Sequence, residues 1–299
     1  MDLVTPAYRG AAAVAQFLPS AVIDAVAPEL AALVALPLGD RRAMVERHQR
    51  RVDPGLHGAA LRQRVRDVYR SYGRYWAESF RLPTVDPAEL DARITTEGYE
   101  HVEEARAKGL GPMLVLPHLG SWEWCAFWLT RVKHVPVTAV VEQLDPPALF
   151  DWFADFRRGI GMEIVPLGPE AGRAIMTAIR EAHIIALLCD RDIAGGGVEV
   201  TFFGEKTTLP GGPAVLALRT GAPLLPTAVY DRGRGHHHGV VRPPIPAERQ
   251  GSFRADVARI TQLMADELEG LIRRAPEQWH LLQPNWPSDA ATSARPVRL

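Results

Sequence analysis

The chain has 299 residues, of which 47% are hydrophobic and 23% charged, enough for one large α/β domain or for a domain with an accessory layer. This composition excludes a disordered chain. The net charge of −1 and an isoelectric point near 6.8 argue against a general nucleic-acid binder, so we expect no nucleic-acid partner.

The N-terminal third separates apolar from basic sequence. Residues 1–39 predict two short apolar helices broken near Pro19 and Pro28, and residues 40–81 predict helices rich in arginine. Between Arg41 and Arg81 there are eleven arginines and four acidic residues, so this segment carries +7 and the remainder −8. This segment is either a solvated helical face or a patch that binds anionic lipid. In a lipid-binding patch, each basic residue near the surface contributes on the order of 1 kcal/mol to the free energy of binding.

The extreme N-terminus resembles a targeting segment only superficially. Gly10–Ile23 is uncharged, and Ala25-Val26-Ala27 imitates a signal-peptidase site, but the run is only 14 residues long and contains Pro19. No window reaches the roughly 18–20 apolar residues of a spanning helix. We therefore expect neither cleavage nor a transmembrane helix. The two cysteines, Cys125 and Cys189, predict buried thiols in a reducing compartment rather than a disulfide framework.

From Glu89 onward, apolar runs alternate with helical windows, which indicates a mostly parallel central sheet flanked by helices. We therefore predict an α/β fold with an N-terminal helical layer, divided into a membrane-association layer (1–84) and a catalytic core (85–299). The expected strands are Met113–Leu116, Val135–Val141, Glu163–Pro166, Ile184–Leu188, Val198–Phe203 and Leu224–Tyr230, with a possible edge strand at Val240-Val241. The expected helices lie near 97–108, 121–132, 146–158, 169–182, 211–220 and 253–274, and the last ten or so residues predict a loose tail.

His118 and Glu123 are the first candidates for catalysis. His118 follows a buried strand, and after it come a Gly120-Ser121 turn and a helix that starts near Trp122. This order places the imidazole close to the Glu123 carboxylate in the first helical turn. An imidazole with a pKa of about 6.5 can take a proton from a hydroxyl, and a carboxylate can fix its tautomer. The same spacing also fits a loop histidine followed by a helix-capping glutamate.

Other polar groups follow the predicted strands. Glu142 follows one strand and the Asp190-Arg191-Asp192 triplet follows another, and ligands of open α/β sheets bind at such ends. The triplet fits a ligand pocket or a structural ion-pair network equally well. Arg157 fits a helix C-terminal cation or a ligand-binding residue.

Several catalytic signatures are missing from the sequence. There is no G-x-S-x-G, no P-loop, no G-x-G-x-x-G after a strand, no C-x-x-C and no H-E-x-x-H. Adjacent histidines cannot easily face one ion, so His236-His237-His238 predicts a solvated loop rather than a metal site. We expect no bound metal or other cofactor.

The chain resembles the lipid A lauroyl/myristoyl acyltransferases, which are lysophospholipid acyltransferase-like enzymes with an H-x4-D/E motif, and within them the actinobacterial phosphatidylinositol mannoside acyltransferases. The resemblance covers nearly the whole chain. It rests on H-x-x-x-x-E at His118–Glu123, CDRD at 189–192, VEVTFFGEKTTLPGGPAVLALRTGAPLLPTAVY at 198–230, PEQWHLLQPNW at 276–286 and SYGRYWAESFRLP in the N-terminal layer.

The resemblance implies transfer of a fatty acyl chain from acyl-CoA, as co-substrate, to a glycolipid hydroxyl. It assigns His118 as the base and Glu123 as its charge partner. By position, it implies substrate contacts for Glu142, Arg157, Asp190, Arg191, Asp192 and, less directly, His280. The lipid A enzymes usually begin with a transmembrane helix, and its absence favours a peripheral enzyme at the cytoplasmic face of the plasma membrane, on an anionic surface.

A thioester is already activated, so direct attack by a hydroxyl requires a base, an oxyanion donor and a slot for the acyl chain. The aromatic side chains of Trp122, Trp124, Phe127 and Trp128 either line that slot or form plain core. Three alternatives remain open: a thioesterase that passes the acyl group to water, an acyltransferase for another glycolipid or a lysophospholipid, and a non-catalytic lipid-binding protein.

Overall fold

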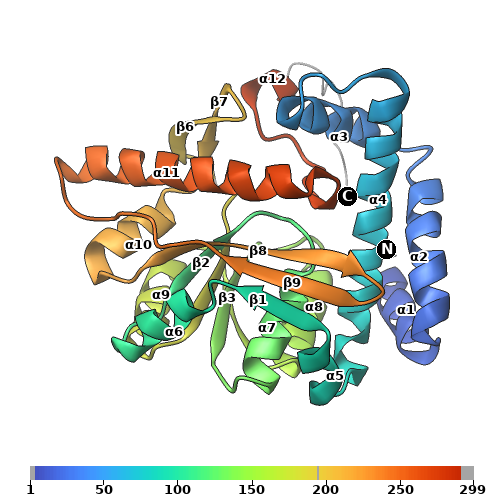
Figure 1. Cartoon of the computed structure of the whole chain (residues 1–299), viewed down its shortest axis with the longest axis horizontal. Helices are drawn as coiled ribbons and strands as arrows, with labels where there is room; N and C mark the ends of the chain where they lie inside the picture. The colour runs from blue at the N-terminus through green and yellow to red at the C-terminus, as the bar shows by residue number, and fades with distance from the viewer. Residues whose placement is uncertain (1–3, 194, 291–299) are drawn as a thin grey trace.

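A computed structural model describes residues 4–193 and 195–290 of the chain, so the expected tail beyond residue 290 lies outside the described residues. Its centre is a seven-stranded sheet with the strand order β1-β9-β8-β2-β5-β3-β4 (Figure 1). All neighbouring strands are parallel except β8 and β9. The predicted mostly parallel sheet is confirmed. Its strands are β1 (Ile94–Glu97), β2 (Met113–Leu116), β3 (Val137–Val141), β4 (Met162–Pro166), β5 (Ile184–Leu188), β8 (Leu224–Gly233) and β9 (His236–Val241).

Helices cover both faces of the sheet, and strand β2 shows why. Met113 and Val115 point into one apolar cluster, while Leu114 and Leu116 point into the other, because successive side chains of a strand alternate between faces. A strand buried on both faces reads as a continuous apolar run. The first cluster receives α9 (Ala171–Arg180), α10 (Gly212–Thr220) and α11 (Phe253–Arg274), and the second receives α5 (Pro87–Ala92), α6 (Glu100–Ala107) and α7 (Trp122–Arg131).

The expected strand Val198–Phe203 belongs to a separate hairpin rather than to the main sheet. Strands β6 (Val198–Phe202) and β7 (Glu205–Leu209) pair antiparallel around a two-residue turn. Both turn residues, Phe203 and Gly204, have positive φ (51° and 74°), as the tight hairpin turns require. The prediction missed β7 because Phe203 extended the apolar alternation into the turn.

The expected loop at His236-His237-His238 is wrong. These residues begin strand β9, which is longer than the predicted Val240-Val241 and pairs with both β8 and β1. Since strand residues alternate between faces, His237 is buried while His236 is exposed.

Four helices form a layer at one side of the sheet, on the right in Figure 1. They are α1 (Val4–Phe17), α2 (Ser20–Val34), α3 (Gly39–Val52) and α4 (Gly58–Arg81), which is followed by the short helix η1 (Leu82–Thr84). The predicted break at Pro28 is absent, because Pro28 lies inside α2. Helices α2 and α4 approach closely at Gly73, where a Cβ atom would lie 2.5 Å from that of Ala31. The division of the chain at residue 84 stays a prediction.

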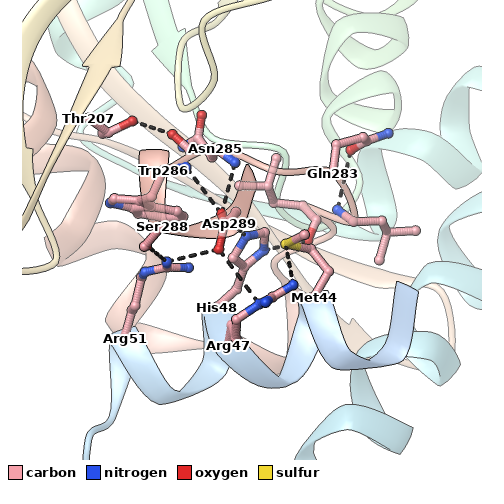
Figure 2. Close-up of polar contacts among 12 residues, drawn as sticks. Met44, Arg47, His48, Arg51, Thr207, Gln283, Asn285, Trp286, Ser288 and Asp289 are labelled. Carbon is pink, nitrogen blue, oxygen red and sulfur yellow. Dashed lines mark hydrogen bonds and ion pairs between the residues drawn. The ribbon is translucent and has the colours of Figure 1, made fainter. Parts of the chain in front are cut away.

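After α11, residues 276–290 form a C-terminal strap that crosses from the sheet to α3. It contains η2 (Pro276–Gln278) and α12 (Pro287–Ala290). Figure 2 shows how Asp289 fastens it: the buried carboxylate accepts from Arg51 Nη2 at 2.9 Å and from the backbone N–H of Asn285 at 3.0 Å, and it lies 3.4 Å from His48 Nε2. The strap thus joins the first helices of the chain to the core.

No single helix among residues 4–193 and 195–290 has the length and apolar character needed to cross a bilayer. Taken as a pair, α2 and α3 pass by length and composition, but the chain bends by 106° between them.

Candidate active site

His118 lies at the carboxyl end of β2, beside the carboxyl end of β5. Since β2 and β5 are parallel neighbours with Leu116 opposite Leu188, the residues that follow each strand emerge together. Asp190 Oδ1 lies 2.6 Å from His118 Nδ1, and Asp190 Oδ2 accepts the backbone N–H of His118 at 3.0 Å. Because the Asp190 carboxylate accepts a hydrogen bond, the imidazole proton lies on Nδ1, and Nε2 is left as the basic nitrogen.

Asp190 is fully buried and held from the C-terminal strap. Trp279 Nε1 donates to Asp190 Oδ2 at 2.7 Å, and Asn285 Nδ2 donates to the Asp190 carbonyl at 2.9 Å. The carboxylate is therefore oriented by groups on two segments of the chain, the end of β2 and the C-terminal strap. The His118 side chain, in contrast, keeps 29% of its surface exposed, so a substrate can reach it.

The electrostatics of the pair favour the charged forms. Burial disfavours the His118 imidazolium, but the neighbouring Asp190 carboxylate outweighs it, so the pKa of His118 is raised. Burial also opposes ionisation of Asp190, yet His118 and the Trp279 indole hold the pKa of Asp190 below its usual value. Asp190 is thus the carboxylate in contact with the candidate base.

Glu123 lies in the first turn of α7, as predicted, but its contacts lead elsewhere. Its Oε1 accepts from Tyr75 Oη at 2.8 Å and from Arg157 Nη2 at 2.9 Å. Its Oε2 is buried and has no hydrogen-bond partner in the described part of the chain. Burial lowers the pKa of Arg157, but Glu123 outweighs it and raises that pKa, so the two groups form a buried ion pair. Assistance of His118 by Glu123 stays a prediction.

The turn between these residues is held by backbone contacts. Gly120 has a φ of 61°, and a Cβ atom there would lie 1.8 Å from the Val229 carbonyl oxygen, so only glycine fits. Gly120 N–H donates to the Gln278 carbonyl and Ser121 N–H to the Val229 carbonyl, at 3.0 and 3.1 Å. Ser121 occupies the predicted N-cap position of α7 but makes no side-chain cap, because its hydroxyl donates to Glu78.

The remaining predicted site residues surround the His118 and Asp190 pair. Arg191 Nη1 lies 3.7 Å from Glu142 Oε2, a partly exposed pair across the ends of β3 and β5. Asp192 accepts the backbone N–H groups of Gly195 and Gly197 and the hydroxyl of Thr208. It also lines a polar cavity of about 290 Å³ with Glu199, Lys206, Thr207, Thr208, Asn285 and Trp286.

His280 is buried next to His118. Its backbone N–H donates to the His118 carbonyl at 2.7 Å, and its Nε2 lies 2.9 Å from Ser71 Oγ. Burial, reinforced by the charge of His118, lowers the pKa of His280 to about 3, so this imidazole is neutral.

A small apolar cavity of about 20 Å³ lies between α7 and the sheet. Trp122 lines it and Phe127 does not, so the acyl slot stays a prediction. Trp124 and Trp128 are buried elsewhere, against His237 and Tyr99 respectively. The other lining residues are Leu114, Leu116, Cys125, Ala126, Leu129, Val137, Ile184, Ala186, Thr227 and Val229.

The sequence analysis did not predict five residues that hydrogen-bond to the predicted site residues or to the turn between them: Ser71, Tyr75, Glu78, Trp279 and Asn285. The segments that carried the resemblance contain all five. Their roles depend on which strand or helix they face, and no spacing rule reveals that.

Comparison with known proteins shows the family of the chain. The model of the bacterial lipid A biosynthesis acyltransferases matches residues 4–288. A phosphatidylinositol mannoside acyltransferase of Mycobacterium tuberculosis is 42% identical over 230 residues, which cover 75% of this chain and 71% of that protein.

A protein of the same name from Mycolicibacterium smegmatis is 36% identical over 77% of this chain and 75% of its own length. A lipid A biosynthesis acyltransferase of Haemophilus influenzae is 26% identical over 64% of this chain and 58% of its own. The predicted resemblance is confirmed. The chain is an acyltransferase and belongs to the bacterial lipid A biosynthesis acyltransferase family.

Proposed function

We propose that this enzyme transfers a fatty acyl chain, such as palmitoyl, from acyl-CoA to a mannose hydroxyl of a phosphatidylinositol mannoside. The mycobacterial relatives that carry this name support the acceptor class. The observation that carries the chemistry is the 2.6 Å contact between His118 Nδ1 and Asp190 Oδ1, which prepares Nε2 as a base.

The reaction needs no covalent intermediate on the enzyme. His118 Nε2 takes the proton of the acceptor hydroxyl as its oxygen attacks the thioester carbonyl carbon. The tetrahedral intermediate then collapses, the bond from carbon to sulfur breaks, and the departing CoA thiolate takes the proton from the imidazolium. Asp190 stabilises the imidazolium in between, because it keeps its negative charge throughout.

In this proposal Glu123 assists the base indirectly. Its ion pair with Arg157 fixes the first turn of α7 relative to α8 (Pro147–Gly159), and the Arg157 guanidinium also packs 5.4 Å from the centre of the Trp122 ring. Trp122 lines the apolar cavity. The pair thus orients the wall of the proposed acyl slot.

The two cavities suit the two parts of the reaction. The apolar cavity under α7 has a volume of only about 20 Å³, so we propose that it widens to take the acyl chain; its lining offers almost no polar surface. The polar cavity would take the acceptor head group, because its carboxylates, hydroxyls and amide suit sugar hydroxyls. Lys206 pairs with Glu199, so Asp192 is the carboxylate that would repel an anionic CoA nucleotide. We propose that Glu142 and Arg191 contact the substrate beside His118, and that buried His280 supports them from behind.

The N-terminal layer would bind the membrane surface. The exposed large hydrophobic side chains of the described residues all lie between Val14 and Leu38, including Phe17, which is 89% exposed. A solvent-exposed apolar band of this kind is typical of an interfacial helix. Exposed Arg62 and Arg66 would add attraction to anionic lipid, whereas Arg74 already pairs with Asp231. We therefore propose a peripheral enzyme that binds through this layer, and we place it at the cytoplasmic face of the plasma membrane.

Mass spectrometry of the lipid products tests the proposed function. The enzyme is incubated with palmitoyl-CoA and a panel of acceptors: phosphatidylinositol mannosides, a lipid A precursor, a lysophospholipid and no acceptor. We expect an added palmitoyl group on the mannosides. Acylation of only the lipid A precursor or only the lysophospholipid would identify that lipid as the acceptor in place of the mannosides. Acyl-CoA consumption without an acceptor would establish a thioesterase.

Vesicle co-sedimentation tests the membrane assignment. The triple variant V26E/L30E/L33E places charge on three exposed positions of α2 and should abolish binding to anionic vesicles. A variant that changes the charge in the opposite sense away from the layer, E100Q/E103Q/E104Q on α6, should bind at least as well as the wild type. Unchanged binding of the α2 variant would refute a bilayer-facing α2, and loss of acyl transfer to micellar acceptor would reveal a folding defect instead.

A further inference from the structure

A buried polar cluster lies behind the turn that joins His118 to Glu123, and the proposed reaction does not use it. It contains Glu78 of α4, His237 of β9 and Trp124 of α7, each at most 6% exposed. The ring centres of Trp124 and His237 lie 4.4 Å apart with their planes tilted by 32°, and Glu78 Oε2 lies 3.8 Å from His237 Nε2.

Glu78 is connected directly to the turn. Its Oε2 accepts the hydroxyl of Ser121 at 3.1 Å, and Ser121 lies between the proposed base and Glu123. The backbone of the turn is fixed on β8 and on the C-terminal strap, whereas this side-chain bond and the bond from Tyr75 to Glu123 connect it to α4. A movement of Glu78 would therefore displace the amino end of α7.

The surroundings of Glu78 do not support a negative charge. The facing groups are Arg74 on its own helix, Asp24 of α2, Asp231 of β8, His237 and Ser121. Arg74 already forms an ion pair with Asp231, with its Nε 2.6 Å from Asp231 Oδ2. Burial, with some repulsion from His236 and Arg93, lowers the pKa of His237 to about 3, so its ring is neutral. The cluster thus offers Glu78 a hydroxyl and a neutral imidazole rather than a cation.

Several polar atoms of the cluster are without a hydrogen-bond partner in the described residues: Glu78 Oε1, both ring nitrogens of His237 and Trp124 Nε1. A carboxylate only accepts hydrogen bonds, but a protonated carboxyl group also donates one. An uncharged Glu78 can accept from Ser121 and donate toward the imidazole, directly or through one water. A charged Glu78 cannot donate to it.

We propose that Glu78 is a positioning residue for acyl transfer, whose uncharged carboxyl group holds Ser121 and thereby the turn between His118 and Glu123. The role in transfer rests on the proposed function, but the link to the turn does not. Burial, followed by repulsion from Asp231, raises the pKa of Glu78 to about 8, which agrees with an uncharged group at neutral pH. Ser121 can donate to either form of Glu78, but ionisation at alkaline pH would end the donation toward His237 and leave a buried charge without a partner. That charge would draw Glu78 out of the cluster and so loosen the turn.

The test compares pH profiles of acyl transfer between pH 7 and 9.5. Glu78→Gln keeps an uncharged group with one acceptor and one donor, so its rate at pH 7 should stay within a few-fold of the wild type. The wild-type rate should decline across this range, and the decline should vanish in E78Q. Ser121→Ala should lower the rate about tenfold at pH 7, as expected for loss of one buried hydrogen bond. Glu104→Gln, on exposed α6, should keep the wild-type profile.

Hydrogen exchange of residues 113–125 supplies a readout that does not depend on turnover. Protection of this segment, corrected for intrinsic rates, should fall in the wild type above pH 8 and persist in E78Q. The proposal is overturned if E78Q loses activity and protection with pH as the wild type does, or if S121A behaves as the wild type at pH 7. If no acceptor is acylated at all, the proposed function fails, while the exchange data still decide whether Glu78 holds the turn.

Discussion

The carboxylate of Asp190 contacts His118 at two points, the imidazole Nδ1 at 2.6 Å and the backbone N–H at 3.0 Å. The first contact fixes the tautomer and the second fixes the position of the residue that carries the ring. Trp279 and Asn285 in turn fix Asp190 from the C-terminal strap. The strap is therefore part of the catalytic apparatus that we propose.

Asp190→Asn should lower acyl transfer roughly 10²-fold or more, because the amide favours the wrong tautomer of His118 and does not stabilise the imidazolium. Turnover of palmitoyl-CoA with the acceptor measures this. Asp192→Asn is the matched control, since Asp192 does not contact the imidazole and should affect KM for the acceptor more than kcat. Equal losses in kcat from both variants would count against a special role for Asp190.

The pH dependence of the transfer rate should reflect the contact between His118 and Asp190. His118 must be deprotonated to act as a base, and Asp190 raises its pKa, so the rate should fall with acid through a midpoint above the ordinary histidine value of about 6.5. In D190N the midpoint should move to lower pH, because burial then acts without the carboxylate. An acid limb at the same pH in both enzymes would assign it to another group.

Glu123→Gln should reduce transfer less than loss of the His118 imidazole, because the base remains in place. The substitution leaves Arg157 without its buried partner, which costs roughly 3 kcal/mol in the free energy of unfolding. Chemical denaturation and transfer rates are measured for E123Q, R157Q and the double variant. If Glu123 acts through Arg157, the double variant should lose clearly less than the sum of the two single losses; simple additivity would refute the coupling.

Ala126→Leu should shift the preferred acyl chain to shorter lengths, because the added methyl groups occupy the apolar cavity under α7. Competition between CoA thioesters of different chain length measures the preference. Ala105→Leu, buried in α6 outside the cavity, controls for general overpacking. An unchanged preference in a folded A126L enzyme would place the acyl chain elsewhere.

Asp289→Asn should destabilise the fold by roughly 3 kcal/mol, since it removes a buried charge that faces Arg51 and His48. Burial opposes ionisation of Asp289, but His48 and two backbone N–H groups outweigh it and lower its pKa. Its stabilising effect is therefore present above about pH 4 and is lost as pH falls through the lowered pKa. Urea denaturation at pH 7 measures the effect, and S288A at the exposed rim should change stability far less.

The alternation of strands and helices was predictable from periodicity, because a parallel sheet covered on both faces leaves continuous apolar runs such as Met113–Leu116. The pairing of His118 with Asp190 was not, although both were predicted at strand ends, since strand order decides which ends meet. Spacing pointed to Glu123 instead, five residues away, whose side chain turns toward Arg157. The buried histidine of β9 escaped notice because three polar residues in a row conceal the alternation of a strand.

The central claim is that His118 is the base. Transfer of radiolabelled palmitate from palmitoyl-CoA to the mannoside acceptor should fall by orders of magnitude in His118→Ala, with melting temperature and vesicle binding retained. His57→Ala, an exposed histidine at the start of α4, should transfer as the wild type does. Near-normal transfer by folded H118A would contradict the proposed mechanism.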